Sequence, residues 1–223
     1  MNKTLQLSLA TACCVLAGAA HAQAAGDWLV RVGTLKVTPM VTSGDLSAPS
    51  FAGSQVGVGP STVLAGGVTY MLDNHISFDL PLSTPLKHDI TGAGSVAGVG
   101  KLGDTQALPM TVLAQYRFDE PTSQLRPYVG LGPTYAVFYK EHGTNTLTAL
   151  SGGTPGAPTG LSIKNQFGFT AQVGASLALN NRWSLDAALT KTWLKTRATL
   201  SSGQGLDLRL DPRGVTVNVG YRF

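Results

Sequence analysis

The chain has little charge and no long hydrophobic run. Only 13% of its 223 residues are charged, and 27 are glycine. The one extended apolar stretch, Leu5 to Ala20, is shorter than the ~20 residues that a membrane-spanning helix needs, and no second stretch follows it. With so few charges a water-soluble globule would be poorly solvated, whereas strands that meet lipid on alternate residues would not. The composition therefore favours a membrane β-barrel over a helical membrane protein.

Cysteine is absent from everything after residue 14. Cys13 and Cys14 both lie in the N-terminal apolar stretch, so the rest of the chain has no disulfide and no cysteine metal site. A lipoprotein processed at Cys13 is an alternative interpretation. It requires the apolar core to end early and places Leu9 one position too far upstream.

The first residues have the features of an export signal. Lys3 precedes the apolar run, and the small-x-small sequences AHA and AQA follow it. We predict a cleaved signal peptide, residues 1–24, with cleavage after Ala22 or Ala24, and a single mature barrel domain, residues 25–223. Removing Lys3 lowers the net charge from +4 to +3. That excess is too small to indicate a nucleic-acid partner.

The last residues alternate with a period of two. From Val215 to Phe223 every odd-numbered residue is apolar or aromatic, and the residues between are small or polar. Such alternation places one set on each face of a strand. A soluble sandwich strand alternates equally well, but it rarely needs to end on an aromatic residue of its apolar face. We interpret Tyr221 and Phe223 as the residues that close the barrel and signal its assembly.

The same alternation recurs upstream and gives eight strands in all. Their odd or even apolar positions begin at Trp28, at about residue 62, and at Ile76, Leu108, about residue 127, Phe167 and Trp183. Short connections near residues 73–74, 119–125 and 180–181 alternate with long ones at 39–61, 88–107, 141–163 and 200–212. This predicts an all-β fold, an eight-stranded antiparallel transmembrane β-barrel, with short periplasmic turns, long extracellular loops and both mature termini in the periplasm.

Several short motifs resemble the OmpW family of outer-membrane proteins, in order and spacing, across the whole mature chain. They are Tyr70–Asn74, Thr84–Ile90, Leu108–Tyr116, Arg126–Gly130, Leu210–Pro212 and Gly220–Phe223. The resemblance implies a barrel of a Gram-negative outer membrane that passively admits small hydrophobic molecules. In that family an apolar tunnel leads from the extracellular mouth, and substrates leave sideways into the bilayer. The loops 39–61 and 141–163 are less typical.

Charged side chains on the inward parity gather near the turns. Asp79 and Arg117 lie on neighbouring predicted strands, as do Asp186 and Arg222, and the last strand pairs with the one that carries Arg31. Unpaired buried charges are costly, so we expect these groups to pair and to plug the lower barrel. The predicted plug is Arg31, Asp79, Gln115, Arg117, Asp186, Asn218 and Arg222. The same residues also suit a closed barrel that is purely structural.

The upper lumen has no acidic or basic residue at its predicted inward positions. An ion or sugar channel needs charged or polar lining, whereas an apolar lining favours a greasy ligand. The predicted channel lining is Leu35, Pro109, Leu113, Phe138 and Leu194. Glycines such as Gly130 and Gly174 either thin the wall for lateral exit or, more simply, relieve crowding inside it.

Signals for chemistry are weak. His75, His88 and His142 are too scattered to indicate a metal site, and no GxSxG motif is present. Ser83 and His88 are the one pair that an enzyme interpretation would test. We therefore expect no enzyme, no metal and no cofactor.

The predicted function is a passive outer-membrane channel for small hydrophobic molecules. The expected partners are the lipid bilayer and lipopolysaccharide, small hydrophobic ligands, and the barrel-assembly machinery through the C-terminal strand. A structural or surface-interaction barrel without transport is the alternative.

Overall fold

The computed structural model describes residues 23–154 and 156–223. The described part begins at Gln23, directly after the first predicted cleavage site, and residues 1–22 of the predicted signal peptide lie outside it. The described chain is almost entirely β-strand, with one helix, α2 (Asn145–Leu150). No helix within it is both long and apolar enough to cross a membrane.

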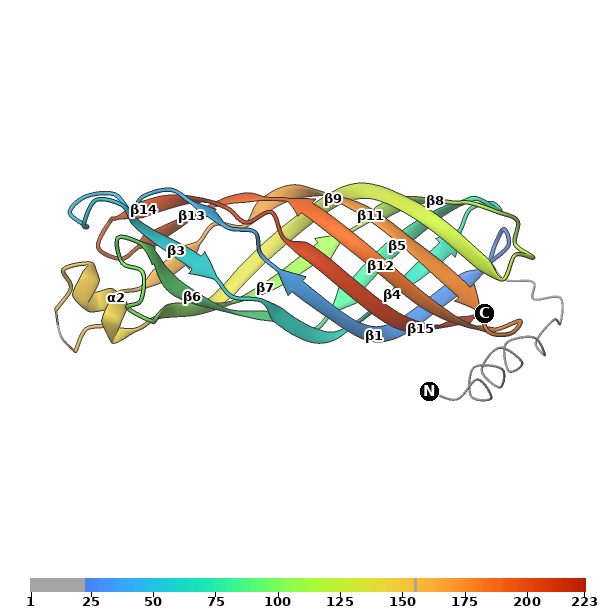
Figure 1. Cartoon of the computed structure of the whole chain (residues 1–223), viewed down its shortest axis with the longest axis horizontal. Coiled ribbons are helices and arrows are strands. Elements are labelled where there is room, and N and C mark those ends of the chain that lie inside the picture. Colours follow the sequence, from blue (N-terminus) through green and yellow to red (C-terminus); the bar gives the residue numbers. More distant parts are fainter. Residues whose placement is uncertain (1–22, 155) are drawn as a thin grey trace, which may run out of the picture.

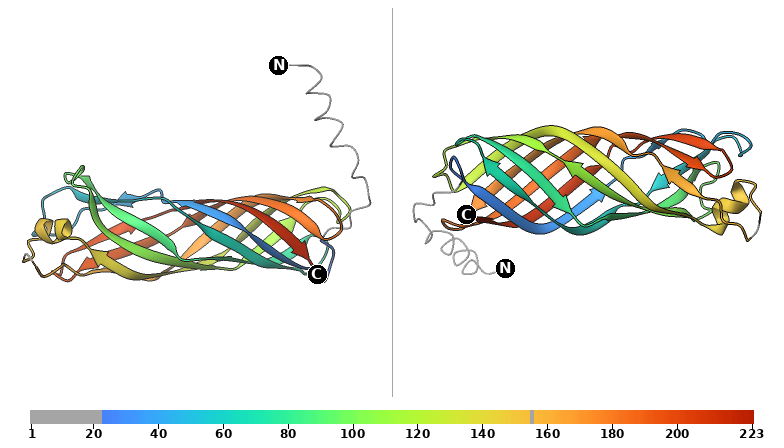
Figure 2. Two further views of the ribbon diagram at one scale, coloured as in Figure 1. Left: turned by 90° about the horizontal axis from the view of Figure 1, so that it is seen from below. Right: turned by 180° about the vertical axis from the view of Figure 1, so that it is seen from behind.

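Eight antiparallel strands, several of them broken in two, close into a long barrel (Figures 1 and 2). This confirms the predicted fold class. In ring order they are β1 (Trp28–Thr38); β4 (Ser61–Met71) with β3 (Ser54–Val58); β5 (Ile76–Ser83) with β6 (Leu86–Gly94); β8 (Leu113–Arg117) with β7 (Lys101–Thr111); β9 (Leu125–Gly143); β11 (Gln166–Ala178); β12 (Trp183–Trp193); and β15 (Arg213–Arg222).

The ring closes where the last strand meets the first. β15 pairs along β1, with Tyr221 opposite Val30, and the Phe223 amide donates to the Trp28 carbonyl at 2.9 Å. Tyr221 also packs edge-on against Phe223, with ring centroids 4.8 Å apart. Every barrel strand then has a neighbour on each side, as a lipid-exposed sheet requires.

The two faces of the wall follow the alternation in the sequence. On β12, Trp183, Leu185 and Leu189 are exposed, whereas Ser184 and Asp186 are buried. The same pattern runs along β1, β5, β8 and β15. Apolar side chains outside and polar ones inside invert the arrangement of a soluble barrel, which is the arrangement that a lipid solvent selects.

Both ends of the barrel are defined by their connections. The turn end carries the three short connections and the C-terminus; the loop end carries α2 and the long connections (Figure 1). At the turn end, Asp73 Oδ1 accepts hydrogen bonds from the amides of His75 and Ile76 at 2.7 and 2.6 Å. Asn180 does the same for Arg182 and Trp183. These side-chain oxygens bond the backbone amides that have no partner strand where the strands end.

The long connections are more regular than predicted. A second, four-stranded sheet, ordered β10 (Leu161–Ile163), β13 (Lys195–Leu200), β14 (Gly205–Arg209) and β2 (Thr42–Ser43), continues the wall at the loop end. Hence the segments 39–61, 88–107, 141–163 and 200–212, predicted as loops, each contain strand residues, and 88–107 is mostly strand. Prolines stand at four of the breaks between successive strands, because proline has no N–H to donate to a ladder: Pro39, Pro60, Pro85 and Pro212.

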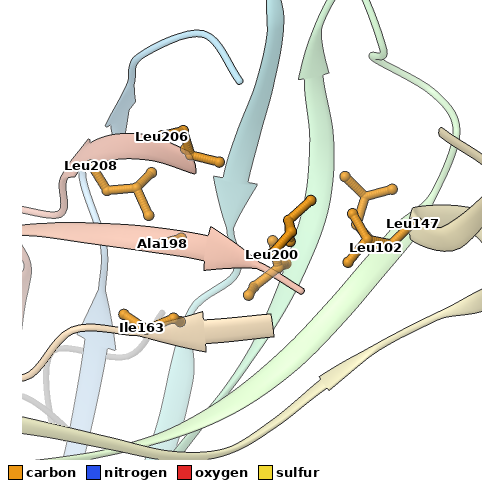
Figure 3. Close-up of a cluster of buried hydrophobic side chains, with 8 residues drawn as sticks. Leu102, Leu147, Ile163, Ala198, Leu200, Leu206 and Leu208 are labelled. Carbon is orange, nitrogen blue, oxygen red and sulfur yellow. The ribbon is translucent and has the colours of Figure 1, made fainter. Parts of the chain in front are cut away.

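A hydrophobic cluster holds the loop end together. Its members come from β6, β7, α2, β10, β13 and β14 and point toward one another (Figure 3). They are Ile90, Leu102, Leu147, Ile163, Ala198, Leu200, Leu206 and Leu208. Burial of these side chains stabilises strands that extend beyond the lipid-facing band.

Candidate ligand cavity and polar floor

A buried ion-pair network fills the barrel at the turn end. Arg31 contacts two carboxylates, Asp79 at 2.5 Å and Asp186 at 3.1 Å. Thr69 donates to the same oxygen of Asp79, while Tyr128 and Ser176 donate to Asp186. Both carboxylates are only 1% exposed. One cation shared by two hydrogen-bonded carboxylates is how such charges are tolerated inside a narrow barrel.

A second cation is held by neutral groups. Arg117 donates to the side-chain oxygens of Gln23 at 2.7 Å, Gln115 at 2.9 Å and Ser77 at 3.3 Å. Its guanidinium also lies over the Tyr128 ring, 4.7 Å from the centroid. Tyr128 therefore joins the two parts of the network, which we call the polar floor.

The segment before β1 completes the polar floor from below. Gln23 is buried; besides accepting from Arg117, it donates to Ser176 at 3.0 Å, and its carbonyl accepts from Arg126 at 2.6 Å. Three strands thus bond to this one residue. Next to it, Asp27 accepts from the Ala24 amide and pairs with Arg222 at 3.1 Å.

The pairing differs from what strand adjacency suggested. Asp79 and Asp186 both pair with Arg31 rather than with Arg117 and Arg222. Arg222 lies half-buried at the rim beside Asp27, and Arg117 has no carboxylate within ion-pair distance in the described chain. Asn218 is buried, but its Oδ1 has no hydrogen-bond partner there. The reason is side-chain length. In the ring, β1 lies between the strands that carry Asp79 and Asp186, and the Arg31 side chain is long enough to contact both carboxylates.

Several members of the polar floor were missed from the sequence. Tyr128 and Arg126 share the inward parity predicted for their strand, so the alternation alone could have found them. Gln23 lies before the first strand, and no periodicity points to it. Gly174 provides the room for Tyr128, because a Cβ there would stand 2.5 Å from the ring. This contact favours the crowding interpretation of that glycine.

A layer of hydroxyls lies above the polar floor. Thr111, Thr134, Thr170 and Thr192 form one hydrogen-bonded chain across four neighbouring strands, with oxygen separations of 2.8, 2.5 and 2.8 Å. Because each hydroxyl bonds to the next, this chain leaves few hydroxyl groups free to bind a ligand in the space above it.

Above the threonines the barrel is hollow. A cavity of about 210 Å³ extends from Leu113 and Gln172 up to the hydrophobic cluster at the loop end. Its lining in the described chain includes no Asp, Glu, Lys or Arg; His88 is the one titratable side chain there, among apolar side chains, hydroxyls and the amides of Gln55 and Gln172. A dry apolar cavity of about 150 Å³ is already large enough for benzene. The chemistry of this space suits a small hydrophobic molecule.

All five residues predicted to line the channel border this cavity. Leu35 lies on β1, Pro109 and Leu113 on the barrel strand formed by β7 and β8, Phe138 on β9, and Leu194 between β12 and β13. Residues in the long connections between the barrel strands also line the cavity, and the sequence did not predict this. Leu46, Val96, Leu147 and Leu206 also line the cavity, and nothing in their local pattern marked them as inward.

The barrel wall has an unpaired seam beside the cavity. The β5–β8 ladder ends at Asp79 opposite Leu113, and the β6–β7 ladder begins at Leu86 opposite Ala107. Residues 80–85 and 108–112 have no ladder pairs with each other, and this stretch contains Pro81, Pro85 and Pro109. These prolines remove three N–H donors from the wall.

The seam lies between the cavity and the outer surface. Pro81, Ser83, Pro109 and Thr111 line the cavity from the two strands of the seam. Leu82 also lines it and is at the same time 53% exposed. A side chain with access to both sides marks a thin place in the wall.

The structure gives no sign of a metal centre in the described part of the chain. No group of three or more His, Cys, Asp or Glu side chains could hold an ion there. His88 Nδ1 lies 2.7 Å from the Gly59 carbonyl, and no hydrogen bond joins it to Ser83 among the described residues.

An apolar outer belt, a closed ring of eight strands and a buried ionic interior define a transmembrane β-barrel of the bacterial outer membrane. The model of the OmpW family matches residues 24–223, so the chain belongs to the OmpW family. Members of this family are outer-membrane barrels, and a channel-type role is consistent with the hollow interior.

Related proteins match this chain over nearly its full length. Outer membrane protein W of Vibrio cholerae is 33% identical over 204 residues, 89% of each chain. Among solved structures, the outer membrane protein OprG of Pseudomonas aeruginosa is 27% identical, with a TM-score of 0.81, covering 91% of this chain and 98% of that one. Outer membrane protein AlkL in lipid bilayers has a TM-score of 0.68 at 23% identity, over 90% and 91%, and supports the fold.

Proposed function

We propose that the protein is a passive outer-membrane channel for small hydrophobic molecules, without enzymatic activity or a cofactor. The ligand enters at the loop end, occupies the apolar cavity and leaves sideways through the seam. The observation that carries this proposal is the cavity itself, which is uncharged, closed below by the polar floor and bordered at its side by an unpaired wall.

The orientation follows from the connections. Short turns and both mature termini face the periplasm, and the loop end faces outward, where it meets lipopolysaccharide. The signal peptide predicted within residues 1–24 directs export, and its removal after Ala22 or Ala24 leaves the barrel as the mature domain. The last strand, with Tyr221 and Phe223 at its exposed end, is the segment that the assembly machinery recognises.

The energetics favour apolar cargo. Moving apolar surface out of water contributes roughly 25 cal/mol per Å², and the cavity lining offers matching surface. An ion would lose its hydration without gaining a partner in this lining, at a cost of several kcal/mol. In this proposal the bonded side chains of the polar floor block straight passage to the periplasm. Leu113 and Gln115 mark the transition from cavity to floor, and both are buried.

Uptake of a monoterpene-sized probe by cells that lack or carry the gene tests the proposal. Leu113→Asp and Phe138→Asp place a charge in the cavity and are expected to reduce flux at least severalfold while the barrel still folds. Phe51→Asp is the matched control, because Phe51 is 69% exposed and does not line the cavity. Equal flux with and without the protein would contradict transport and favour a structural or surface-interaction barrel.

Cross-linking tests the lateral exit. The mature chain is free of cysteine, so Leu82→Cys with Met110→Cys puts two thiols on the outer face of the seam. A short bifunctional thiol reagent across this pair should lower flux. Val32→Cys with Val219→Cys is the control, because these residues face each other in a fully paired ladder. Undiminished flux through the cross-linked seam would place the exit elsewhere.

A further inference from the structure

The upper cavity wall carries a small polar group of side chains whose hydrogen bonds are incomplete. His88 on β6 and Thr105 on β7 both line the cavity and stand directly opposite each other in the ladder. Directly opposed residues have Cβ atoms about 5 Å apart, so the two side chains are neighbours on one face. Both are buried, at 6% and 4% exposure.

The hydrogen bond of His88 fixes which of its nitrogens is free. Gly59 offers only a carbonyl oxygen to Nδ1, 2.7 Å away, so Nδ1 must carry the proton and donate. In the neutral imidazole Nε2 is then an acceptor. Since Nδ1 is committed to the wall, Nε2 is the nitrogen left for the cavity. Burial lowers the pKa of His88, which keeps the ring neutral and Nε2 an acceptor.

Thr105 supplies the complementary donor. Its Oγ1 is buried and has no hydrogen-bond partner in the described chain. Ser83, which lines the cavity beside the seam, has a hydroxyl in the same condition. The threonines of the layer below differ, because each bonds to its neighbour. Buried polar groups without partners are costly, so their presence in a ligand cavity calls for a partner.

We propose that His88 and Thr105 form a polar anchor that binds the hydroxyl group of a small apolar alcohol or phenol. The ligand O–H donates to His88 Nε2, and the Thr105 hydroxyl donates to the ligand oxygen. The hydrocarbon part of the ligand fills the apolar cavity below. This inference rests on the proposed function and narrows its ligands from hydrophobic molecules in general to those that carry one hydroxyl.

Two probes of similar size test the anchor: 1-naphthol and 1-methylnaphthalene. Their binding is measured with the folded protein in lipid nanodiscs and corrected with empty nanodiscs. Thr105→Val removes the hydroxyl at constant shape. His88→Asn keeps a donor near Gly59 but has no group in place of Nε2. Each change should weaken 1-naphthol about two- to tenfold, the range for one hydrogen bond, and leave 1-methylnaphthalene within twofold.

Controls separate the anchor from general damage. Thr216→Val alters a cavity-lining hydroxyl that already donates to the Ala188 carbonyl, and it should not change the ratio of the two affinities. In wild-type protein, the ¹⁵N signal of His88 Nε2 should shift with 1-naphthol and not with 1-methylnaphthalene. The anchor is wrong if Thr105→Val and His88→Asn weaken the binding of both probes equally, or if they weaken the binding of neither probe. Failure of the proposed transport would appear differently: the flux of both probes would be the same in cells with and without the protein, whatever their affinity ratio.

Discussion

Replacing Arg31 with methionine is expected to be the most damaging single change in the polar floor. Arg31 is the cation that Asp79 and Asp186 share, and all three side chains are buried. Its loss leaves two carboxylates close together, with only hydroxyl donors remaining: Thr69 for one, and Tyr128 and Ser176 for the other. Breaking a buried ion pair by removing one partner costs about 3–5 kcal/mol, and we expect a loss in that range.

The assay is the free energy of unfolding in urea, with the protein folded in lipid vesicles and followed by tryptophan fluorescence. Arg222→Met is the matched control, because Arg222 and Asp27 are each about one-fifth exposed and their pair should contribute about 0–1 kcal/mol. Neutralising both acids as well, with Asp79→Asn and Asp186→Asn, should recover most of the stability lost in Arg31→Met. Equal losses for Arg31→Met and Arg222→Met, or no recovery in the triple variant, would refute the reasoning.

Three further results are expected. Lys87 and Asp89 face outward on either side of His88, so this part of β6 lies beyond the lipid band. Burial, the largest influence, holds the pKa of His88 below 6.5 despite the Gly59 carbonyl and Asp89. The unfolded chain therefore takes up the proton first, and stability falls as pH drops through 6.5 toward the folded pKa. An NMR titration of the ring and a smaller pH effect in His88→Asn check this. Gly174→Ala should cost about 1–3 kcal/mol by pushing against Tyr128, whereas Gly59→Ala meets only an ordinary contact at 3.6 Å; equal melting temperatures would contradict the crowding role. The mass of the mature protein should correspond to a chain that begins at Gln23, because cleavage after Ala24 would remove the residue that bonds to Arg117, Ser176 and Arg126; a mass that begins at Ala25 would contradict this.

The wall of the barrel was the part most accessible to sequence reasoning. Each strand repeats with a period of two, and the solvent on each side differs, so parity alone assigns every side chain of β12 or β15 to lipid or lumen. The strands that were hardest to recognise, near 62–72 and 127–139, correspond to β4 and β9. β9 extends from Leu125 to Gly143 and pairs first with β8 and then with β7, across a register shift near its end.

Partners across the lumen were not accessible in the same way. Strand adjacency is local information, whereas Arg31 reaches two carboxylates because its long side chain crosses the interior. Parity places a residue on a face without giving its height or reach. Residues outside the strands, such as Gln23 and Leu147, follow no period, so their place at the floor and the cavity depends on how the chain folds back.

Side-chain length explains why one barrel is sealed at one end and hollow at the other. A wall of strands surrounds both regions, and what differs between them is the set of inward residues. Near the turns these are long and branched, with Arg31, Arg117 and Tyr128 meeting across the axis. Above Leu113 they are mostly threonine, alanine and aliphatic residues, which stop short of the axis. Because an eight-stranded interior has little more room than its side chains fill, shortening them is the only way to open it. Filling the hollow from one wall, for instance with Ala136→Phe, should therefore abolish uptake and leave the polar floor intact.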